Sequence, residues 1–315
     1  MRFFWLLTFV PTFLLGAIEI RTFDPILILN SIITTQTLPP HYRSTHDLKD
    51  REDDYSFSMS GLSDLMVSGS AQFSVEELRA MIQHTEGKGL IIFDLRKEPH
   101  GFINNFAVSW YVPKNWLNVN LGFDECVSDE RRRLDEAMQE KDIIMHKIVE
   151  KSYGESYATA IKLPINAHHM STEEALCHNL GVGYVRLCVT DHLRPGDDMV
   201  DLFIKAALTL PDETWAHFHC KAGKGRTTTF MALFDMMKNA KRLSLQDIVM
   251  RHWALGGTNL FATPPNTSWK YGHHTKRQEF LAKFYEYCKD QAPHFDTLWS
   301  EWNATHYRTY QEEVL

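Results

Sequence analysis

The stretch His-Cys-Lys-Ala-Gly-Lys-Gly-Arg-Thr, residues 219–227, decides the fold and chemistry of this 315-residue chain. Strand-like apolar residues precede it and a helical run, residues 228–234, follows it, so it is a loop that opens a helix N-terminus. Backbone N–H groups at such a terminus bind anions. Five residues separate the thiol of Cys220 from the guanidinium of Arg226. This arrangement predicts a cysteine nucleophile that attacks a phosphate.

The other residues of this cysteine loop, 219–227, have expected supporting roles. Arg226 can hold two phosphate oxygens, and Gly223 and Gly225 let the backbone N–H groups point inward. Thr227 could donate a hydrogen bond to the cysteine sulfur, or could simply be a residue of the first helical turn. We expect His219 to fix the loop through backbone hydrogen bonds rather than to donate a proton, because neighbouring strand side chains alternate. The alternative for the whole loop is a buried cysteine in an ordinary strand-to-helix turn.

Composition limits the classes of protein that fit. With 44% hydrophobic residues, the chain can form one large domain or one domain with an insertion. A formal charge of −7 argues against binding to nucleic acid. Residues 1–17 resemble a signal peptide, with an uncleaved anchor or a buried strand as alternatives, so we expect a secreted or periplasmic protein without stable membrane insertion.

The cysteines point to neither a metal site nor a disulfide framework. There are five of them, an odd number, and their spacing is not that of paired metal ligands. No metal or other cofactor is therefore predicted.

The order of predicted elements indicates an α/β protein. We expect a signal peptide at 1–17, an extended arm at 18–54, and a catalytic domain at 55–315. Its middle third lacks a strand–helix rhythm, which suggests an inserted subdomain around 104–168 with a charged helical stretch at 124–150. Elsewhere the pattern predicts helices at 74–84, 172–179, 199–208, 244–254 and 274–289, and strands at 90–93, 184–189 and immediately before Cys220.

The cysteine loop resembles the Cys-x-x-x-x-x-Arg signature of protein-tyrosine-phosphatase-like enzymes. Residues 94–101, 104, 108–111 and 190–192 are similar to the bacterial phytases of that class, and the likeness covers about 43–291. It implies an α/β fold: a tyrosine-phosphatase-like core with a central mixed sheet flanked by helices, plus a small inserted β-subdomain. It also implies metal-independent removal of phosphate from inositol hexakisphosphate.

By this resemblance Cys220 is the nucleophile, Arg226 the phosphate clamp and Asp191 the general acid. The residues alone agree on Asp191, which follows a strand end on a loop that could act as a lid. Asp197 and Asp198 are rivals by position, but they are better explained as carboxylates at a helix start.

Positive charges around the loop determine the expected substrate. Lys221 and Lys224 add two cations to the loop, whose sequence resembles that of the phosphoinositide 3-phosphatase tumour suppressor, so several phosphates are expected on a small anionic substrate. Either lysine could instead be a solvated surface charge. Similarity to the family adds peripheral phosphate contacts, which gives these candidate substrate-binding residues: Lys221, Ala222, Gly223, Lys224, Gly225, His192, Arg43, Lys270, Lys276 and Arg277.

The segment Asp94, Arg96, Glu98 and His100 could be mistaken for a metal site. Alternation would place all four on one face, so we expect a salt-bridge network that supports the active site.

The sequence thus predicts a cysteine phosphatase of inositol polyphosphates that works through a cysteinyl-phosphate. A phosphoinositide-lipid or phosphotyrosine-protein phosphatase and an inactive phosphate-binding module remain alternatives. A rhodanese-type sulfurtransferase would also use a loop cysteine, but the Arg226-Thr227 ending favours phosphate.

Overall fold

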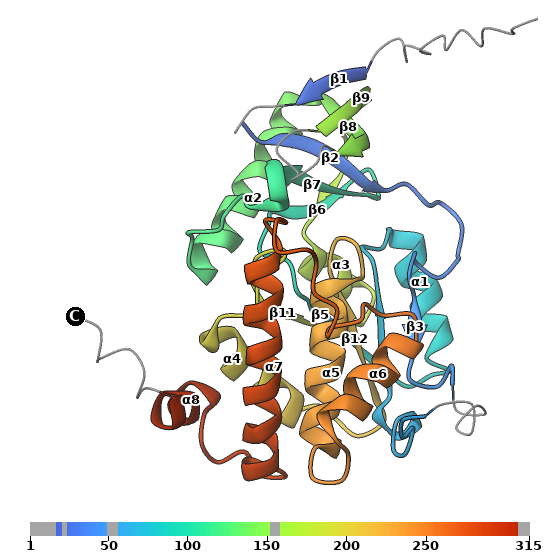
Figure 1. The fold of residues 1–315 in the computed structure, drawn as a ribbon. Coiled ribbons are helices and arrows are strands. Elements are labelled where there is room, and N and C mark those ends of the chain that lie inside the picture. The colour runs from blue at the N-terminus through green and yellow to red at the C-terminus, as the bar shows by residue number, and fades with distance from the viewer. Residues whose placement is uncertain (1–16, 21–23, 49–55, 152–157, 308–315) are drawn as a thin grey trace, which may run out of the picture.

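The structure, a computed structural model, describes residues 17–20, 24–48, 56–151 and 158–307, without the side chains of 17–20. Two β-sheets organise these residues, one surrounded by helices and one lying across its end (Figure 1). The expected signal peptide falls outside the described residues except for Ala17, so it stays a prediction. None of the helices in the described part of the chain combines the length and apolar character that a membrane span requires.

The core contains the mixed sheet that the sequence predicts. Its strand order is β11-β5-β12-β4-β3, with the first four strands parallel and the last pairing antiparallel. The strands are β3 (Arg43–Ser44), β4 (Val67–Ser70), β5 (Gly89–Asp94), β11 (Gly183–Arg186) and β12 (Thr214–His219). Because β12 lies in the centre, its C-terminal end delivers the cysteine loop to the middle of the sheet edge.

Helices cover both faces of this sheet, because its strands alternate apolar side chains between two hydrophobic clusters. Phe93 and Phe218 face the larger cluster, whereas Ile92 and Trp215 face the smaller one. Helices on the larger cluster are α4 (Asp197–Leu208), α5 (Gly225–Asn239), α6 (Leu245–Ala254), α7 (Tyr271–Gln291) and α8 (Trp299–Tyr307). Helices on the smaller cluster are α1 (Val75–His84) and α3 (Glu173–Asn179). The helices predicted in the core are all present.

Local signals explain how two of these helices begin. At α1, Ser74 and Glu77 form the predicted capping box, since each side chain bonds the other residue's backbone N–H. Helix α5 has no such side-chain cap and starts directly from the cysteine loop. Its N-terminal N–H groups are therefore available to a ligand.

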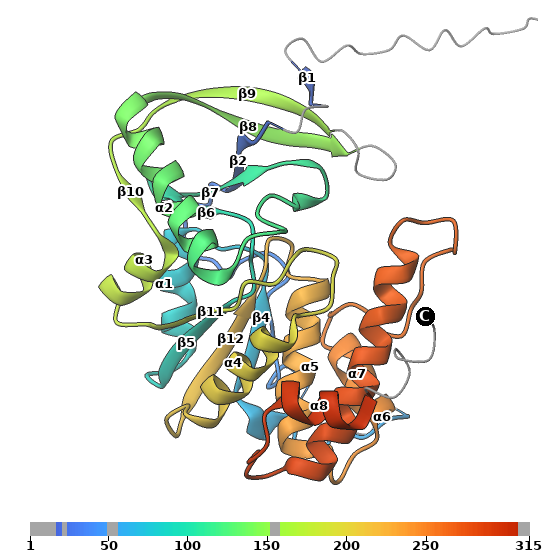
Figure 2. The same ribbon diagram turned by 90° about the vertical axis from the view of Figure 1, so that its left-hand side faces the viewer.

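A second unit, here called the inserted unit, consists of the seven-stranded sheet β1-β9-β8-β2-β7-β6-β10 and helix α2. Figures 1 and 2 show it lying over the end of the core sheet from which the cysteine loop emerges. Its elements are β1 (Ala17–Ile20), β2 (Ile26–Ser31), β6 (His100–Ile103), β7 (Phe106–Tyr111), α2 (Phe123–Glu140), β8 (Asp142–Lys151), β9 (Ala158–Asn166) and β10 (Met170–Ser171).

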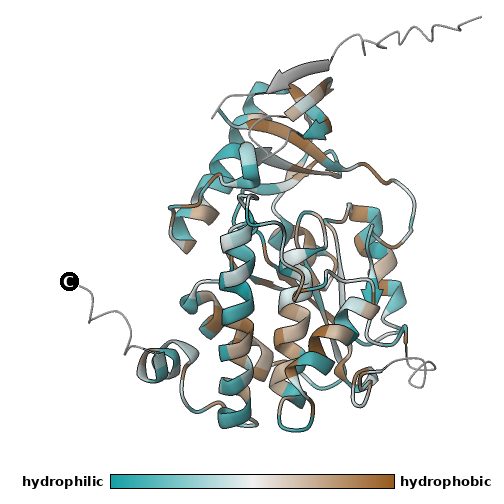
Figure 3. Cartoon of the chain, in the orientation of Figure 1, coloured by the Kyte–Doolittle hydropathy of each residue, from teal (hydrophilic) through white to brown (hydrophobic). Residues whose placement is uncertain are grey.

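Two expectations about this unit need correction. The arm at 18–54 supplies β1 and β2, because the apolar run at 26–29 pairs with β7 and packs inside the unit; β2 is hydrophobic in Figure 3. The helical stretch at 124–150 ends at Glu140, where β8 replaces it. Within β8, Ile143 and Met145 are buried while Ile144 is exposed. This two-residue period is that of a strand, although the segment is rich in charged residues.

Candidate active site

The cysteine loop lines a cavity of about 580 Å³ between the core and the inserted unit. Residues of three origins meet there. The loop gives Cys220, Lys221, Ala222, Lys224, Gly225 and Arg226; the segments beside it give Asp191, His192, Lys270, His274 and Arg277; the inserted unit and its connections give Asn30, Asn115 and Lys151. Most of the residues that the sequence singled out are therefore brought together.

Gly223 fixes the shape of the loop. Its φ is +66°, and a Cβ at this position would lie 2.4 Å from the backbone N of Ala71 and 2.5 Å from the carbonyl carbon of Ser70. Only glycine fits such close contact with the end of β4. The loop consequently curls around the cavity, as its glycines predict.

Cys220 lies at the base of the cavity and is only 2% exposed. The Oγ1 of Thr227 donates a hydrogen bond to its Sγ at 3.2 Å, which is the contact expected from the sequence. A donor at this position can stabilise a thiolate when it attacks a phosphate and when it leaves one.

Arg226 is held rigidly by Glu98. Its Nη1 and Nη2 donate to the two carboxylate oxygens of Glu98 at 2.8 and 2.9 Å, and Nη1 also donates to the carbonyl oxygens of Leu95 and Val189. Burial alone would raise the pKa of Glu98, but Arg226 and Arg96 hold it well below its ordinary value. The guanidinium is thus oriented before any ligand arrives.

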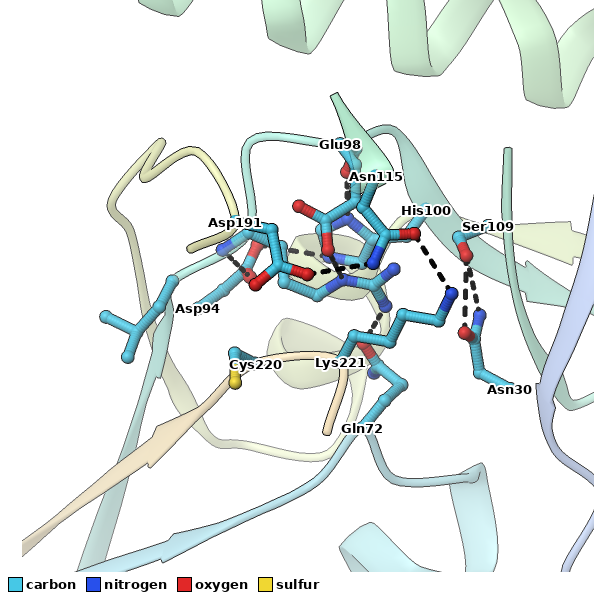
Figure 4. A network of polar contacts seen from close by, with 12 residues as sticks. Asn30, Gln72, Asp94, Glu98, His100, Ser109, Asn115, Asp191, Cys220 and Lys221 are labelled. Carbon is cyan, nitrogen blue, oxygen red and sulfur yellow. Dashed lines mark hydrogen bonds and ion pairs between the residues drawn. The ribbon is translucent and has the colours of Figure 1, made fainter. Parts of the chain in front are cut away.

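Behind Arg226 lies the network expected from residues 94–100. Arg96 Nε donates to Glu98 Oε1 at 3.0 Å, and His100 Nε2 lies 3.1 Å from Asp94 Oδ2 (Figure 4). Asp94, His100 and Glu173 place possible ligand atoms within 4.8 Å of one another. Their carboxylates already pair with nearby donors, Arg186 on Asp94 and Gln72 on Glu173. This is the pattern of a buried ion-pair cluster rather than of a metal cage.

His219 belongs to that cluster, which corrects its expected role. Its Nε2 lies 2.6 Å from Glu173 Oε1, and its ring packs beside Phe73. The side chain therefore ties β12 to α3 instead of fixing the loop through backbone hydrogen bonds. The physical reason is strand alternation, which turns His219 away from the cavity that Cys220 faces.

Asp191 lies across the cavity from the loop, in the segment 190–195. Its Oδ1 is 3.3 Å from Arg226 Nη2. Its Oδ2 accepts a hydrogen bond from Asn115 Nδ2 at 2.8 Å (Figure 4). Burial alone would raise the pKa of Asp191, but Arg226 and His192 hold it below its ordinary value.

The two rival carboxylates lie elsewhere. Asp197 pairs with Arg194 and with the indole N–H of Trp299, and Asp198 accepts from the backbone N of Met199 at the start of α4. Neither lines the cavity that holds the cysteine. Of the three carboxylates that the sequence offers, Asp191 is the one that lines the cavity of Cys220.

Nothing in the local sequence singles out Asn115. It lies in a short turn after β7, with a φ of +57°, and only its contacts with Asp191 and Lys221 mark it as part of the site. A Pro-Lys-Asn turn was the one available cue, and such turns are common in loops without function.

The cationic candidates lie in three places: in the cavity of Cys220, behind the cysteine loop, and in a second cavity. Lys221, Lys224, Lys270 and Arg277 line the cavity, together with His192. Lys221 Nζ also donates to Asn115 Oδ1 at 3.1 Å and lies 4.9 Å from the centre of the Tyr111 ring. Burial, with help from Lys151, lowers the pKa of Lys221.

Two candidates need correction. Arg43 is buried, and its Nη1 and Nη2 donate to the carbonyl of Gly223 and the hydroxyl of Thr228, so it braces the cysteine loop from behind. Lys276 lines a separate cavity of about 430 Å³ on the other side of the 190–195 segment, with Arg194 and His273. Lys276 and Arg277 are consecutive residues of α7 and so point in different directions around the helix, and the sequence alone could not show which direction faces the loop.

Comparison with known proteins agrees with this geometry. A family model of PTP-like phytases, described as "Inositol hexakisphosphate", matches residues 93–238. The solved PTP-like phytase of Bdellovibrio bacteriovorus is 34% identical with a TM-score of 0.70, and the match covers 93% of this chain and 99% of that one. This chain belongs to the PTP-like phytase family.

Three further matches are to chains longer than this one. The tandemly repeated PTP-like phytase of Mitsuokella multacida is 34% identical with a TM-score of 0.78, over 89% of this chain and 49% of that one. A second Mitsuokella structure, 33% identical with a TM-score of 0.77, is a PTP-like myo-inositol phosphatase in complex with myo-inositol-(1,3,4,5)-tetrakisphosphate. The effector protein hopD2 of Pseudomonas syringae is 27% identical over 271 residues, which are 84% of this chain and 56% of hopD2. The chain thus spans about half the length of each of these three matches.

Proposed function

We propose that this chain is a metal-independent cysteine phosphatase that hydrolyses inositol hexakisphosphate and lower inositol polyphosphates through a cysteinyl-phosphate intermediate. One observation carries the proposal. The thiol of Cys220, the braced guanidinium of Arg226 and the carboxylate of Asp191 all line one cavity, at the N-terminus of an uncapped helix. These are a nucleophile, a phosphate clamp and an acid in a single anion-binding site.

In the first step, Cys220 Sγ attacks the phosphorus while the loop N–H groups and Arg226 hold the equatorial oxygens. The P–O bond to the inositol breaks, and Asp191 gives its proton to the leaving oxygen. In the free site Arg226 keeps Asp191 ionised. A bound phosphate dianion competes for the guanidinium and adds negative charge, so the pKa of Asp191 rises when substrate binds, as a general acid requires.

In the second step, Asp191 accepts a proton from water, which attacks the phosphorus of the cysteinyl-phosphate and breaks its S–P bond. The departing thiolate accepts the hydrogen bond from Thr227. Arg226 and the loop N–H groups stabilise both transition states, because the charge develops at the same place in each.

The rim of the cavity favours a substrate with several phosphates. One phosphate occupies the loop, and Lys221, Lys224, Lys270 and Arg277 remain for its neighbours. The inositol tetrakisphosphate bound by the Mitsuokella relative supports the same class of substrate. The two loop lysines also suit a phosphoinositide headgroup, which is the second candidate.

Phosphate release from inositol hexakisphosphate, a phosphoinositide lipid and a phosphotyrosine peptide, each with excess chelator, tests the proposal. We expect the first substrate to be preferred, and Cys220→Ser to lose activity by about 10⁴-fold or more with binding retained. Cys288→Ala, which removes another buried thiol, is the control for general effects of losing a cysteine. Activity that survives in Cys220→Ser, or that disappears on chelation, would contradict the mechanism.

A further inference from the structure

Asn115 occupies the space between Asp191 and Lys221, with both ends of its amide engaged (Figure 4). Its Nδ2 donates to Asp191 Oδ2 at 2.8 Å, and its Oδ1 accepts from Lys221 Nζ at 3.1 Å. We propose that Asn115 is a positioning residue, through which the inserted unit aims Asp191 at the leaving oxygen. This inference rests on the proposed function, because it takes Asp191 as the general acid.

The chemistry of the two neighbours dictates the orientation of the amide. A lysine ammonium can only donate hydrogen bonds, and an ionised carboxylate can only accept them. The amide oxygen must therefore face Lys221 and the amide nitrogen must face Asp191. Asn115 is 4% exposed, so water has little access to compete for either contact.

The backbone that positions the Asn115 side chain adopts an unfavourable conformation. Asn115 has a φ of +57° and follows Lys114, whose φ is +65°. Such left-handed conformations are unfavourable for residues with a side chain, although asparagine tolerates them better than most, and they concentrate at functional sites. The turn is closed by a hydrogen bond from the N–H of Asn115 to the carbonyl of Val112 at 2.9 Å.

The next residue holds the same segment by its main chain. Trp116 Nε1 donates to the carbonyl oxygen of Asp191 at 3.0 Å, and its ring makes edge contacts with Trp269 and His273. His192 contacts Trp269 in turn. One short turn of the inserted unit thus holds both the side chain and the backbone of Asp191.

Both oxygens of the Asp191 carboxylate accept hydrogen bonds. Asn115 donates to Oδ2, and the backbone N–H of His192 donates to Oδ1 at 3.0 Å. Oδ1 also lies beside Arg226, and this contact is the one that a bound phosphate weakens by competing for the guanidinium. The contact with Asn115 does not depend on Arg226, so it continues to hold the carboxyl in place when the phosphate binds.

Comparing kcat on two substrates distinguishes a positioning role of Asn115 from a general disruption of the site. Inositol hexakisphosphate has an alkoxide leaving group that needs an acid, whereas 4-nitrophenyl phosphate has a leaving group stable without one. We expect Asn115→Gly, which keeps the backbone conformation, to lower kcat on inositol hexakisphosphate by about 10- to 100-fold and on 4-nitrophenyl phosphate by less than about threefold. The matched control is Asn118→Gly, a buried asparagine of the same segment with a φ of +70°, which should change neither.

The pH profile gives a second readout. Loss of the N–H donor to Oδ2 raises the pKa of Asp191, so the alkaline limb of kcat should move to higher pH in Asn115→Gly, and further in Asn115→Asp. Equal losses on both substrates, or an unmoved alkaline limb, would overturn the positioning role. Asp191→Asn serves as the reference: if it shows no selective loss on inositol hexakisphosphate, the acid assignment itself fails; if only Asn115→Gly lacks the selectivity, the inference alone fails.

Discussion

Helix α5 carries two buried arginine–carboxylate clusters that look alike and differ in one respect. At its start, Arg226 pairs with Glu98 through two hydrogen bonds. Further along, Asp235 pairs with Arg251 through two hydrogen bonds and with His252 at 2.9 Å. Both pairs are almost completely enclosed, with side-chain exposures of 2% or less.

The difference lies in what the arginine faces on its remaining side. Arg226 lines the cavity and lies 3.3 Å from Asp191, whose side chain is 20% exposed. Arg251 directs its remaining Nη1 at the carbonyl oxygen of Ser60, so protein atoms surround it. We therefore expect the same kind of ion pair to act as a structural link where protein atoms enclose it and as an anion site where one edge faces the cavity.

Matched lysine substitutions should separate the two roles most strongly. Arg226→Lys keeps the charge but loses the planar fork, so we expect phosphatase activity to fall by about 10²- to 10³-fold. Arg251→Lys should keep activity within about threefold but lower the free energy of unfolding by about 1–3 kcal/mol. Steady-state kinetics and urea unfolding measure both. A large activity loss in Arg251→Lys would remove the distinction between the clusters.

The two clusters should respond alike to acid. Burial alone would raise the pKa of Glu98 and of Asp235, but Arg226 acts on the first, and His252 with Arg251 on the second, to hold each value below the ordinary one. Their stabilising contribution is therefore complete above the unfolded value near pH 4 and is lost as the pH falls through the folded values.

We expect the free energy of unfolding to fall below about pH 4, by about 1.4 kcal/mol per pH unit for each such carboxylate. Urea unfolding at several pH values measures this slope. Asp235→Asn should make the slope shallower and leave the pH dependence of turnover unchanged. An unchanged slope in that variant would show that the sealed cluster does not contribute to acid sensitivity.

The smallest expected effect concerns the lysines near the cavity that Arg226 lines. Lys270 lines the cavity of Cys220, whereas Lys276 lines the cavity beyond the 190–195 segment. We expect Lys270→Ala to raise the KM for inositol hexakisphosphate about fivefold, the loss of roughly 1 kcal/mol of binding, and Lys276→Ala to change it less than twofold. Equal effects would mean that both cavities bind substrate phosphates.

The sequence could predict the cysteine loop because that loop is a local structure. Its glycines, its place before a helix and the spacing of Cys220 and Arg226 are all set within nine consecutive residues. The long-range partners were harder to predict. The sequence around Arg43 does not show that it binds the carbonyl of Gly223 from behind the loop. Asn115 contacts residues that lie 76 and 106 positions away, so its role cannot be predicted from local sequence.

Strands that rely on distant partners were also missed. The local sequence of β2 predicts only part of an arm, because its partner β7 lies about 80 residues later in the sequence. The charged residues of β8 suggested a continuing helix, although its apolar residues alternate and pair with β9. In both cases tertiary pairing outweighed the local signal.

The contact between Gly223 and the end of β4 limits how the cysteine loop can diverge. Two backbones meet there without a side chain between them, so neither can move without the other. Ala222 next to it is exposed and Lys224 beyond it is exposed as well. We therefore expect the outward positions of the loop to accept other side chains. A side chain at Gly223 would require both backbones to move at once.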